Sequence, residues 1–103
     1  HDAFLMPENF LTAFAHDHKK SFFELTVSTP EGPRLYGDML AWITPATLTG
    51  CPAVVAPVGL SSNGLPVGVQ IVGPFLEDAV PVQLAGLVGD LTGGFVPPPD
   101  FSD

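Results

Sequence analysis

Two apolar runs dominate the second half of the chain, at residues 53–60 and 67–72. A short polar segment separates them, and its Asn63-Gly64 pair tolerates the positive φ angles of a tight turn. Neither run alternates regularly between apolar and polar positions, which is typical of strands covered by helices on both faces. The pattern therefore predicts two neighbouring strands, joined by a turn and buried on each side.

Helical spacing follows the second run. Apolar residues recur at intervals of three and four positions, at Val80, Leu84, Leu87, Val88 and Leu91. This spacing predicts an amphipathic helix over residues 76–91, in which Pro81 is tolerated if it falls in the first turn. Gly93-Gly94 marks the end of the helix.

A second helix is predicted just before the first apolar run. Asp38 is a suitable N-cap, because its carboxylate can accept a free backbone amide and favours the positive end of the helix dipole. Pro45 conflicts with a continuous helix, since it removes a backbone hydrogen bond, so we expect a kink or a restart there. Gly50 predicts the end of the helix. The helical spacing itself is carried by Met39, Leu40, Trp42, Ile43 and Ala46.

The first third of the chain is less regular. Residues 3–6 predict a short buried strand, and residues 8–15 predict one or two helical turns. Residues 22–27 and 34–36 predict a hairpin across a turn that contains proline and glycine. The order of elements indicates an α/β (α+β mixed) fold with a mixed β-sheet and packing helices.

We expect a single domain with three parts. These are a strand, loop and hairpin over residues 1–36, a helix-strand-strand-helix unit over 37–91, and an extended tail over 92–103.

The amino-acid composition predicts that the chain has a binding partner. Of the 103 residues, 46% are hydrophobic and 14% are charged, and the mean hydropathy is +0.36. So much apolar surface in a short chain indicates an interface with another polypeptide. The net charge of −8 argues against nucleic acid and anionic membranes as partners.

The single cysteine, Cys51, fits a reducing, cytoplasmic setting, and we interpret it as a small packing residue.

Residues 47–73 carry a series of short motifs. They are Thr47-Leu48-Thr49-Gly50-Cys51-Pro52-Ala53, Pro57-Val58-Gly59, Gly64-Leu65-Pro66-Val67-Gly68 and Val69-Gln70-Ile71-Val72-Gly73. The series resembles the C-terminal portion of enzymes of the amidase signature family, serine hydrolases that cleave carboxamides. The resemblance implies a partial amidase-signature-like fold. For the parent enzyme it implies hydrolysis of a C–N bond through a serine acyl-enzyme, with no cofactor and no metal.

The catalytic residues of that family are expected outside this chain. The resemblance implies a serine nucleophile, a second serine in a cis peptide and a lysine base, all in the N-terminal part of a longer domain. Ser61 and Ser62 lack glycine-rich surroundings, so we interpret them as turn residues. Lys19 and Lys20 lie in a polar loop, whereas a base lysine needs burial to lower its pKa. We therefore assign no catalytic residue to this chain.

Three residues are candidates for the wall of a substrate pocket, namely Tyr36, Asp38 and Trp42. The resemblance implies that loops and helix ends in this region line the acyl-binding pocket, with core packing as the alternative role for Trp42. His16 and His18 could share a cation, but such a site needs a third ligand. We interpret the two histidines as solvated loop residues.

These features predict a C-terminal fragment of an amidase-signature hydrolase that gives scaffold and a pocket wall and is inactive alone. Its partner would be the missing N-terminal catalytic part, which in a nicked enzyme is a second polypeptide. Open strand edges would also favour a homo-oligomer. The alternative is a free-standing, non-catalytic structural or protein-interaction domain, which should be a monomer that unfolds cooperatively.

Overall fold

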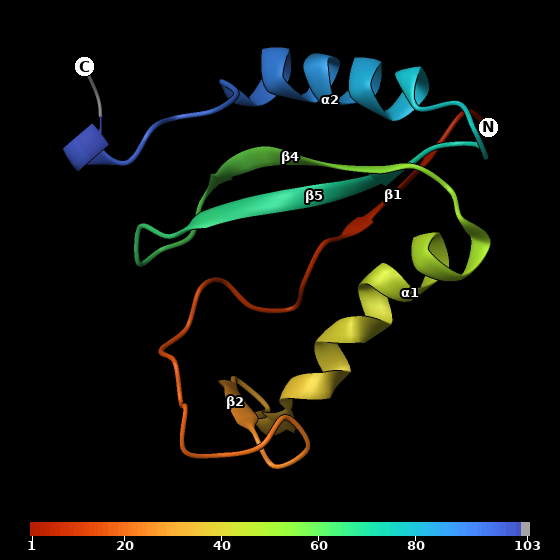
Figure 1. Ribbon diagram of the computed structural model, residues 1–103. Helices are drawn as coiled ribbons and strands as arrows, with labels where there is room; N and C mark the ends of the chain where they lie inside the picture. The colour runs from red at the N-terminus through yellow and green to blue at the C-terminus, as the bar shows by residue number, and fades with distance from the viewer. Residues whose placement is uncertain (102–103) are drawn as a thin grey trace.

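The computed structural model describes residues 1–101, and the last two residues of the expected tail, 102–103, lie outside the described residues. The chain combines strands and helices, with three strands before the first helix and two more between the helices, which confirms the predicted mixed α/β fold class (Figure 1). The strands are β1 (Phe4–Pro7), β2 (Thr26–Thr29), β3 (Gly32–Leu35), β4 (Ala53–Leu60) and β5 (Pro66–Val72). The helices are α1 (Leu40–Thr49) and α2 (Ala79–Thr92), with 3₁₀ turns η1 (Tyr36–Met39) and η2 (Pro99–Phe101).

A three-stranded sheet in the order β1-β5-β4 forms the centre of the fold. Both apolar runs form strands as predicted, and β5 begins one residue earlier than expected. The turn between them sets the register, which places Val54 opposite Ile71 and Val55 opposite Gln70. Every strand pair within residues 1–101 is antiparallel, so the parallel pairs of the expected mixed sheet do not occur in this part of the chain.

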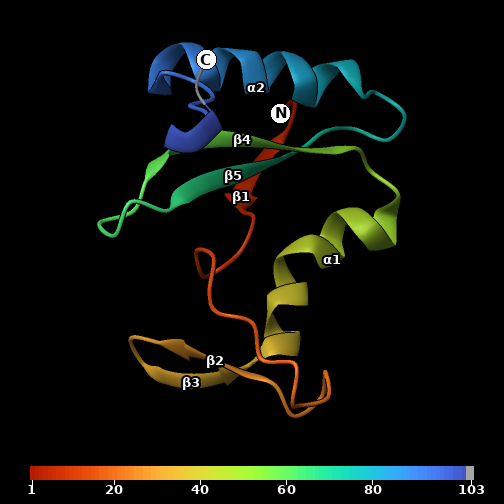
Figure 2. The same cartoon turned by 60° about the vertical axis from the view of Figure 1, so that its left-hand side comes forward.

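Helix α2 covers one face of the sheet (Figure 2). Ile71 is fully buried, and Ala56 of β4 and Pro81 of α2 are buried too. The hydroxyl of Thr92 donates to the carbonyl of Pro57 at 3.1 Å, which fastens the end of α2 to β4. The helix begins three residues later than predicted, and Pro81 lies in its first turn as expected.

The opposite face of the sheet carries less cover than expected. Gln70 is buried, with 4% of its surface exposed, and its side-chain amide donates to the carbonyl of Trp42 at 2.9 Å. This bond joins α1 to the side of the sheet away from α2 (Figure 2). Val55 lies opposite Gln70 on the edge strand and is exposed. The prediction that helices cover both faces is therefore wrong for this face of β4, because α1 leaves it open.

Helix α1 begins differently from the prediction. Asp38 lies inside the 3₁₀ turn η1, and its carboxylate accepts a hydrogen bond from Arg34 Nε at 3.4 Å. Asp38 is therefore not the N-cap, because the guanidinium competes for its oxygens. The helix continues through Pro45 without a restart and ends at Gly50 with φ +68°, a left-handed conformation that glycine adopts without strain. Pro45 is tolerated because the carbonyl that lacks its donor belongs to the exposed residue Ala41.

Residues 8–25 form an irregular loop, so the helical turns predicted over residues 8–15 are wrong. The side-chain oxygen of Asn9 accepts the amide of Phe10 at 2.7 Å, and such local bonds compete with helix formation. The predicted hairpin forms as β2 and β3. Its first strand starts later than expected because the amides of Glu24 and Leu25 both turn back to the carbonyl of Ser21, at 3.0 Å each.

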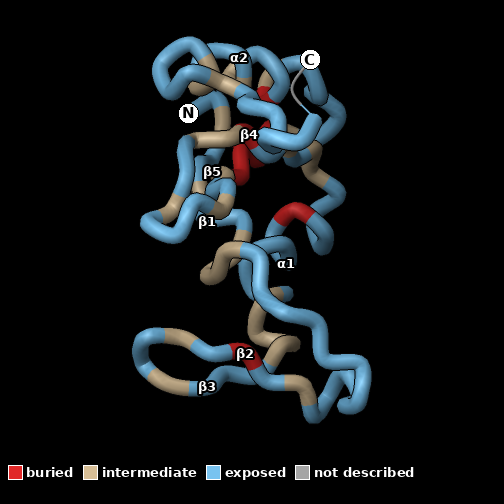
Figure 3. Tube along the Cα trace, turned by 90° about the vertical axis from the view of Figure 1, so that its left-hand side faces the viewer, coloured by how far each residue is buried: buried red, intermediate tan, exposed pale blue. Residues whose placement is uncertain are grey.

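The chain is more extended than its length suggests. Its radius of gyration is 15.5 Å, whereas a compact domain of 100 residues has about 13 Å. The hairpin and the loop before it stand away from the sheet, and most buried residues gather between the sheet and α2 (Figure 3). Within residues 1–101, therefore, α1 and the hairpin receive little cover.

Gly73 marks the tightest packing between β5 and α2, and it gives a direct test of this core. A Cβ at Gly73 would lie 2.5 Å from Cδ and 2.9 Å from Cγ of Pro81, whose ring cannot swing away. We expect Gly73→Ala to lower the free energy of unfolding by about 1–3 kcal/mol in urea denaturation. Gly86→Ala is the matched control, because a Cβ there meets nothing within 4 Å and alanine favours a helix. Equal losses in both variants would contradict the packing argument.

The bond from Gln70 to Trp42 gives a second test. Gln70→Met keeps the length of the side chain but removes the donor, so the Trp42 carbonyl loses its hydrogen bond from the sheet. We expect a loss of about 1–3 kcal/mol in stability, together with faster hydrogen exchange of the α1 amides. Gln83→Met, at an exposed position of α2, is the control. Unchanged exchange in α1 would show that this bond does not hold the helix.

Candidate functional site

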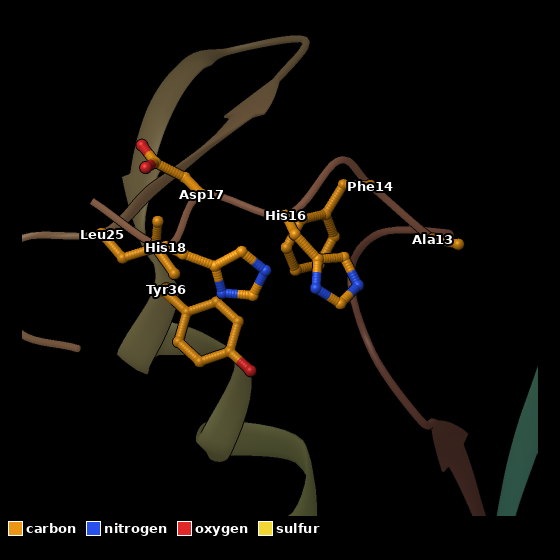
Figure 4. Close-up of a pocket in the computed structure, with 7 residues that line it drawn as sticks. All are labelled: Ala13, Phe14, His16, Asp17, His18, Leu25 and Tyr36. Atoms are coloured by element: carbon orange, nitrogen blue, oxygen red, sulfur yellow. The ribbon is translucent and has the colours of Figure 1, made fainter. Parts of the chain in front are cut away.

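Tyr36 borders a cavity of about 370 Å³ that also contacts the loop before β2. Its backbone amide donates to the carbonyl of Leu25 at 2.9 Å, which fixes the start of η1 against this loop. The Tyr36 ring meets Phe14 edge-on at 6.0 Å and Phe22 edge-on at 5.4 Å. The other residues that line the cavity are Ala13, Phe14, His16, Asp17, His18 and Leu25 (Figure 4).

The two histidines of the loop lie side by side at this cavity. The ring centroids of His16 and His18 are 5.3 Å apart, and both residues are exposed. The Asp17 carboxylate accepts the amide of Lys19 at 3.0 Å and points away from the imidazoles (Figure 4). Among the described residues, no group of three His, Cys, Asp or Glu side chains could hold a metal ion.

A short turn at residues 21–24 follows the two histidines, and its hydrogen bonds change the pKa of Glu24. The Ser21 hydroxyl donates to the Glu24 carboxylate at 2.7 Å, and the Ser21 amide donates to the same oxygen at 3.4 Å. These two bonds lower the pKa of Glu24 from its ordinary value, the hydroxyl contributing most. The turn therefore holds its shape best when Glu24 is ionised.

Asp38 and Trp42 do not join Tyr36 at the cavity. Asp38 is held by Arg34, whose guanidinium also lies over the ring of Phe10 at 4.6 Å. Trp42 is 38% exposed, and its carbonyl takes the hydrogen bond from Gln70. Neither Asp38 nor Trp42 lines the cavity at Tyr36. The structure thus brings one of the three predicted pocket residues to a cavity and leaves the other two on separate surfaces.

A second cavity, also of about 370 Å³, was not predicted from the sequence. It lies between β1, the end of α1 and the residues after β5, and its walls are mostly apolar. Cys51 is among its lining residues and is partly exposed. The cavity forms because β1 pairs with β5, and no local sequence motif predicts this long-range contact.

The family model described as Amidase matches residues 1–80 of the chain. The chain belongs to the amidase family. A glutamyl-tRNA(Gln) amidotransferase subunit of Ehrlichia canis is 32% identical over 89 residues, which cover 78% of this chain. Fatty acid amide hydrolase of Medicago truncatula is 37% identical over 57 residues, 55% of this chain. The 6-aminohexanoate-cyclic-dimer hydrolase of Paenarthrobacter ureafaciens is 43% identical over 48 residues, 47% of this chain.

The match covers a small part of each of these amidase-family relatives. The chain spans 18% of the length of the Ehrlichia canis protein, 9% of the Medicago truncatula protein and 10% of the Paenarthrobacter ureafaciens protein. No helix within residues 1–101 has the length and apolar character needed to cross a membrane.

Ser61 has the role of a turn residue in this amidase-family segment, as predicted. Its hydroxyl donates to the carbonyl of Leu65 at 3.0 Å, accepts the amide of Leu65 at 3.1 Å and is hydrogen-bonded to the side-chain oxygen of Asn63. Ser62 lies exposed in the same turn, and Lys19 and Lys20 are exposed in the loop. The described residues therefore pair no serine with a buried lysine.

The aromatic contacts of Tyr36 give a test of how the cavity is held. We expect Tyr36→Ala to destabilise the loop and hairpin by about 0.5–1.5 kcal/mol for each lost ring pair. Tyr36→Phe should retain both pairs and most of the stability, because only the hydroxyl is removed. The measurement is hydrogen exchange of the hairpin amides. Equal protection in the two variants would show that the rings do not fix the cavity wall.

Proposed function

We propose that the chain is the C-terminal portion of an amidase-family enzyme that hydrolyses a carboxamide. The observation that carries this proposal is the family match over residues 1–80 in a chain that spans 18% of the length of its Ehrlichia canis relative. The remaining length of such a relative leaves room for a catalytic centre that this chain lacks.

In the proposed parent enzyme, a serine oxygen attacks the carbonyl carbon of the amide. The new C–O bond forms, the C–N bond breaks, and the lysine base passes the serine proton to the departing amine. Backbone amides stabilise the oxyanion of the intermediate, and water then hydrolyses the ester to release the acid. This chemistry needs no cofactor and no metal.

In this proposal the chain is part of the scaffold of the parent enzyme and is inactive alone. The hydroxyl of Ser61 is hydrogen-bonded within its own turn, and Lys19 and Lys20 are exposed. These lysines are therefore not placed as a buried base that would activate Ser61 as a nucleophile. Strands β4 and β5 with α2 would extend the sheet and core of the parent.

A wall of the acyl pocket is the second proposed contribution. Tyr36, Asp38 and Trp42 all lie on η1 or the start of α1, and Tyr36 borders a cavity with aromatic walls. The role of Trp42 and Asp38 in this wall would depend on surfaces that the rest of the enzyme supplies.

The proposed partner is the N-terminal catalytic part of the enzyme. The outer edge of β4 has no strand beside it among the described residues, and such an edge favours pairing with another chain. In the absence of the catalytic part, the same edge would favour a homo-oligomer. The single cysteine favours a reducing, cytoplasmic setting.

A chimera tests the proposed function. The 48 matched residues of the Paenarthrobacter ureafaciens hydrolase would be replaced by those of this chain. We expect the chimera to hydrolyse the 6-aminohexanoate cyclic dimer, because related cores tolerate substitution when volume and pattern are kept. The 103-residue chain alone should neither hydrolyse this substrate nor react with a fluorophosphonate, which labels activated serines.

The control is the same hydrolase with the matched segment deleted, which should be inactive. Labelling of Ser61 or Ser62 in the isolated chain would overturn the proposed absence of catalysis. An inactive chimera, together with a monomeric chain that unfolds cooperatively, would favour a free-standing interaction domain instead.

A further inference from the structure

The turn between β4 and β5 contains the one Asn-Gly pair of the chain, Asn63-Gly64. Both residues are exposed, and the turn protrudes beyond the end of the sheet (Figure 1). Gly64 has a φ of +79°, and a Cβ added to it would meet nothing within 4 Å. The peptide nitrogen of Gly64 therefore has no side chain of its own beside it, and the space around its Cα is open.

The side chain of Asn63 is held by the hydroxyl of Ser61, which is hydrogen-bonded to Asn63 Oδ1. The amide of Leu65 donates to the same hydroxyl at 3.1 Å and fixes its position. The carbonyl of Leu65 is the other acceptor within reach, and it already accepts the Ser61 amide at 2.8 Å. This carbonyl therefore keeps a donor when the hydroxyl proton turns to Asn63.

A hydrogen-bond donor on Oδ1 makes Cγ of Asn63 a better electrophile. It draws electrons from the carbon and stabilises the oxyanion that forms when a nucleophile adds there. The nearest nucleophile along the chain is the peptide nitrogen of Gly64, and no β-carbon on that residue hinders closure of a five-membered ring. The turn thus holds an electrophile, its activating donor and a nucleophilic nitrogen within residues 61–64.

One hydrogen bond of the turn opposes this ring closure. The Gly64 amide donates to the carbonyl of Ser61 at 2.9 Å, and this bond has to open before the nitrogen can attack. The bond lies in an exposed turn, where local opening costs little free energy.

We propose that Asn63 is a site of spontaneous deamidation promoted by the Ser61 hydroxyl. The Gly64 nitrogen forms a bond to Cγ of Asn63, the bond from Cγ to the side-chain nitrogen breaks, and ammonia leaves. The proton of the Gly64 amide passes through water to the departing nitrogen. Water then opens the resulting cyclic imide at one of its two carbonyl carbons. This inference goes beyond the proposed function and does not depend on it.

The two products differ in their effect on the turn. Opening at Cγ gives an aspartate, and opening at the backbone carbonyl gives an isoaspartate, whose main chain is longer by one methylene. Either product adds one negative charge to a chain whose net charge is −8. The isoaspartate would also displace the Gly64 amide from the Ser61 carbonyl, and this turn sets the register of β4 and β5.

Peptide mapping by mass spectrometry tests the modification site in the full 103-residue chain. The chain is incubated at neutral pH, and conversion is followed at Asn63 and at Asn9, the other asparagine. We expect Asn63 to convert well before Asn9. Asn9 is followed by the bulky Phe10, whose amide is hydrogen-bonded to the Asn9 side-chain oxygen at 2.7 Å.

The part played by Ser61 is tested by Ser61→Ala, which removes the donor. Each rate is measured in the folded chain and again in urea, and the ratio of the two removes any effect of sequence alone. We expect this ratio to fall about two- to tenfold, which is the rate equivalent of one exposed hydrogen bond. Ser61→Thr keeps the hydroxyl and should keep the ratio. Ser62→Ala, at an exposed position of the same turn, is the matched control and should leave the ratio unchanged.

Conversion of Asn63 no faster than that of Asn9 would overturn the modification site. A ratio that rises or stays the same in Ser61→Ala, or that falls equally in Ser62→Ala, would overturn the role of the Ser61 hydroxyl. Where Ser61→Ala does not fold, Ser61→Cys takes its place in reducing buffer, because a thiol is a weak donor and should lower the ratio in the same direction. An unchanged ratio in that variant would likewise overturn this role.

Discussion

The fold depends on the pairing of β5 with a neighbour along each of its edges. β1 is 4 residues long and joins the sheet only beside β5, while β4 meets β5 along a bulged ladder. Ile71 at the middle of this arrangement is fully buried. Helix α2 packs over the sheet and is fastened to β4 by Thr92, and α1 is tied to β5 by the Gln70 amide, so both helices take their positions from the β4–β5 pair.

The motif that reveals the amidase family is made of packing residues rather than catalytic ones. Gly68 faces Val55 so closely that a Cβ would lie 2.6 Å from its methyl group, and Gly73 is in the same position relative to Pro81. Gln70 between them carries the bond to α1. Each of these positions has a steric or hydrogen-bonding reason to keep its residue type. The segment is therefore recognisable from residues that pack and hydrogen-bond within the fold.

The sequence predicted the elements whose causes are local. The Asn63-Gly64 turn and two apolar runs were enough to place β4 and β5, and Gly50 and Gly93 ended the helices as expected. The failures have causes that the simple pattern rules miss: Arg34, four residues before Asp38, captures its carboxylate, and the tertiary arrangement of residues 1–101 leaves one face of β4 open. The pocket residues Tyr36, Asp38 and Trp42 were predicted from a resemblance, and their separation depends on tertiary contacts that spacing does not encode.

Helix α1 is largely exposed, and those three residues do not share a cavity within residues 1–101. They lie on η1 and α1, the part of the fold joined to the sheet by the amide of Gln70. An uncharged helix gains little from water and much from an apolar partner, so its final position is set by whichever surface covers it. Asp38, bound at 3.4 Å to an exposed Arg34, can exchange that partner at small cost. A pocket wall built on these residues, as proposed for the whole enzyme, would therefore take its geometry from surfaces outside residues 1–101, while Gln70 of β5 ties α1 to the sheet.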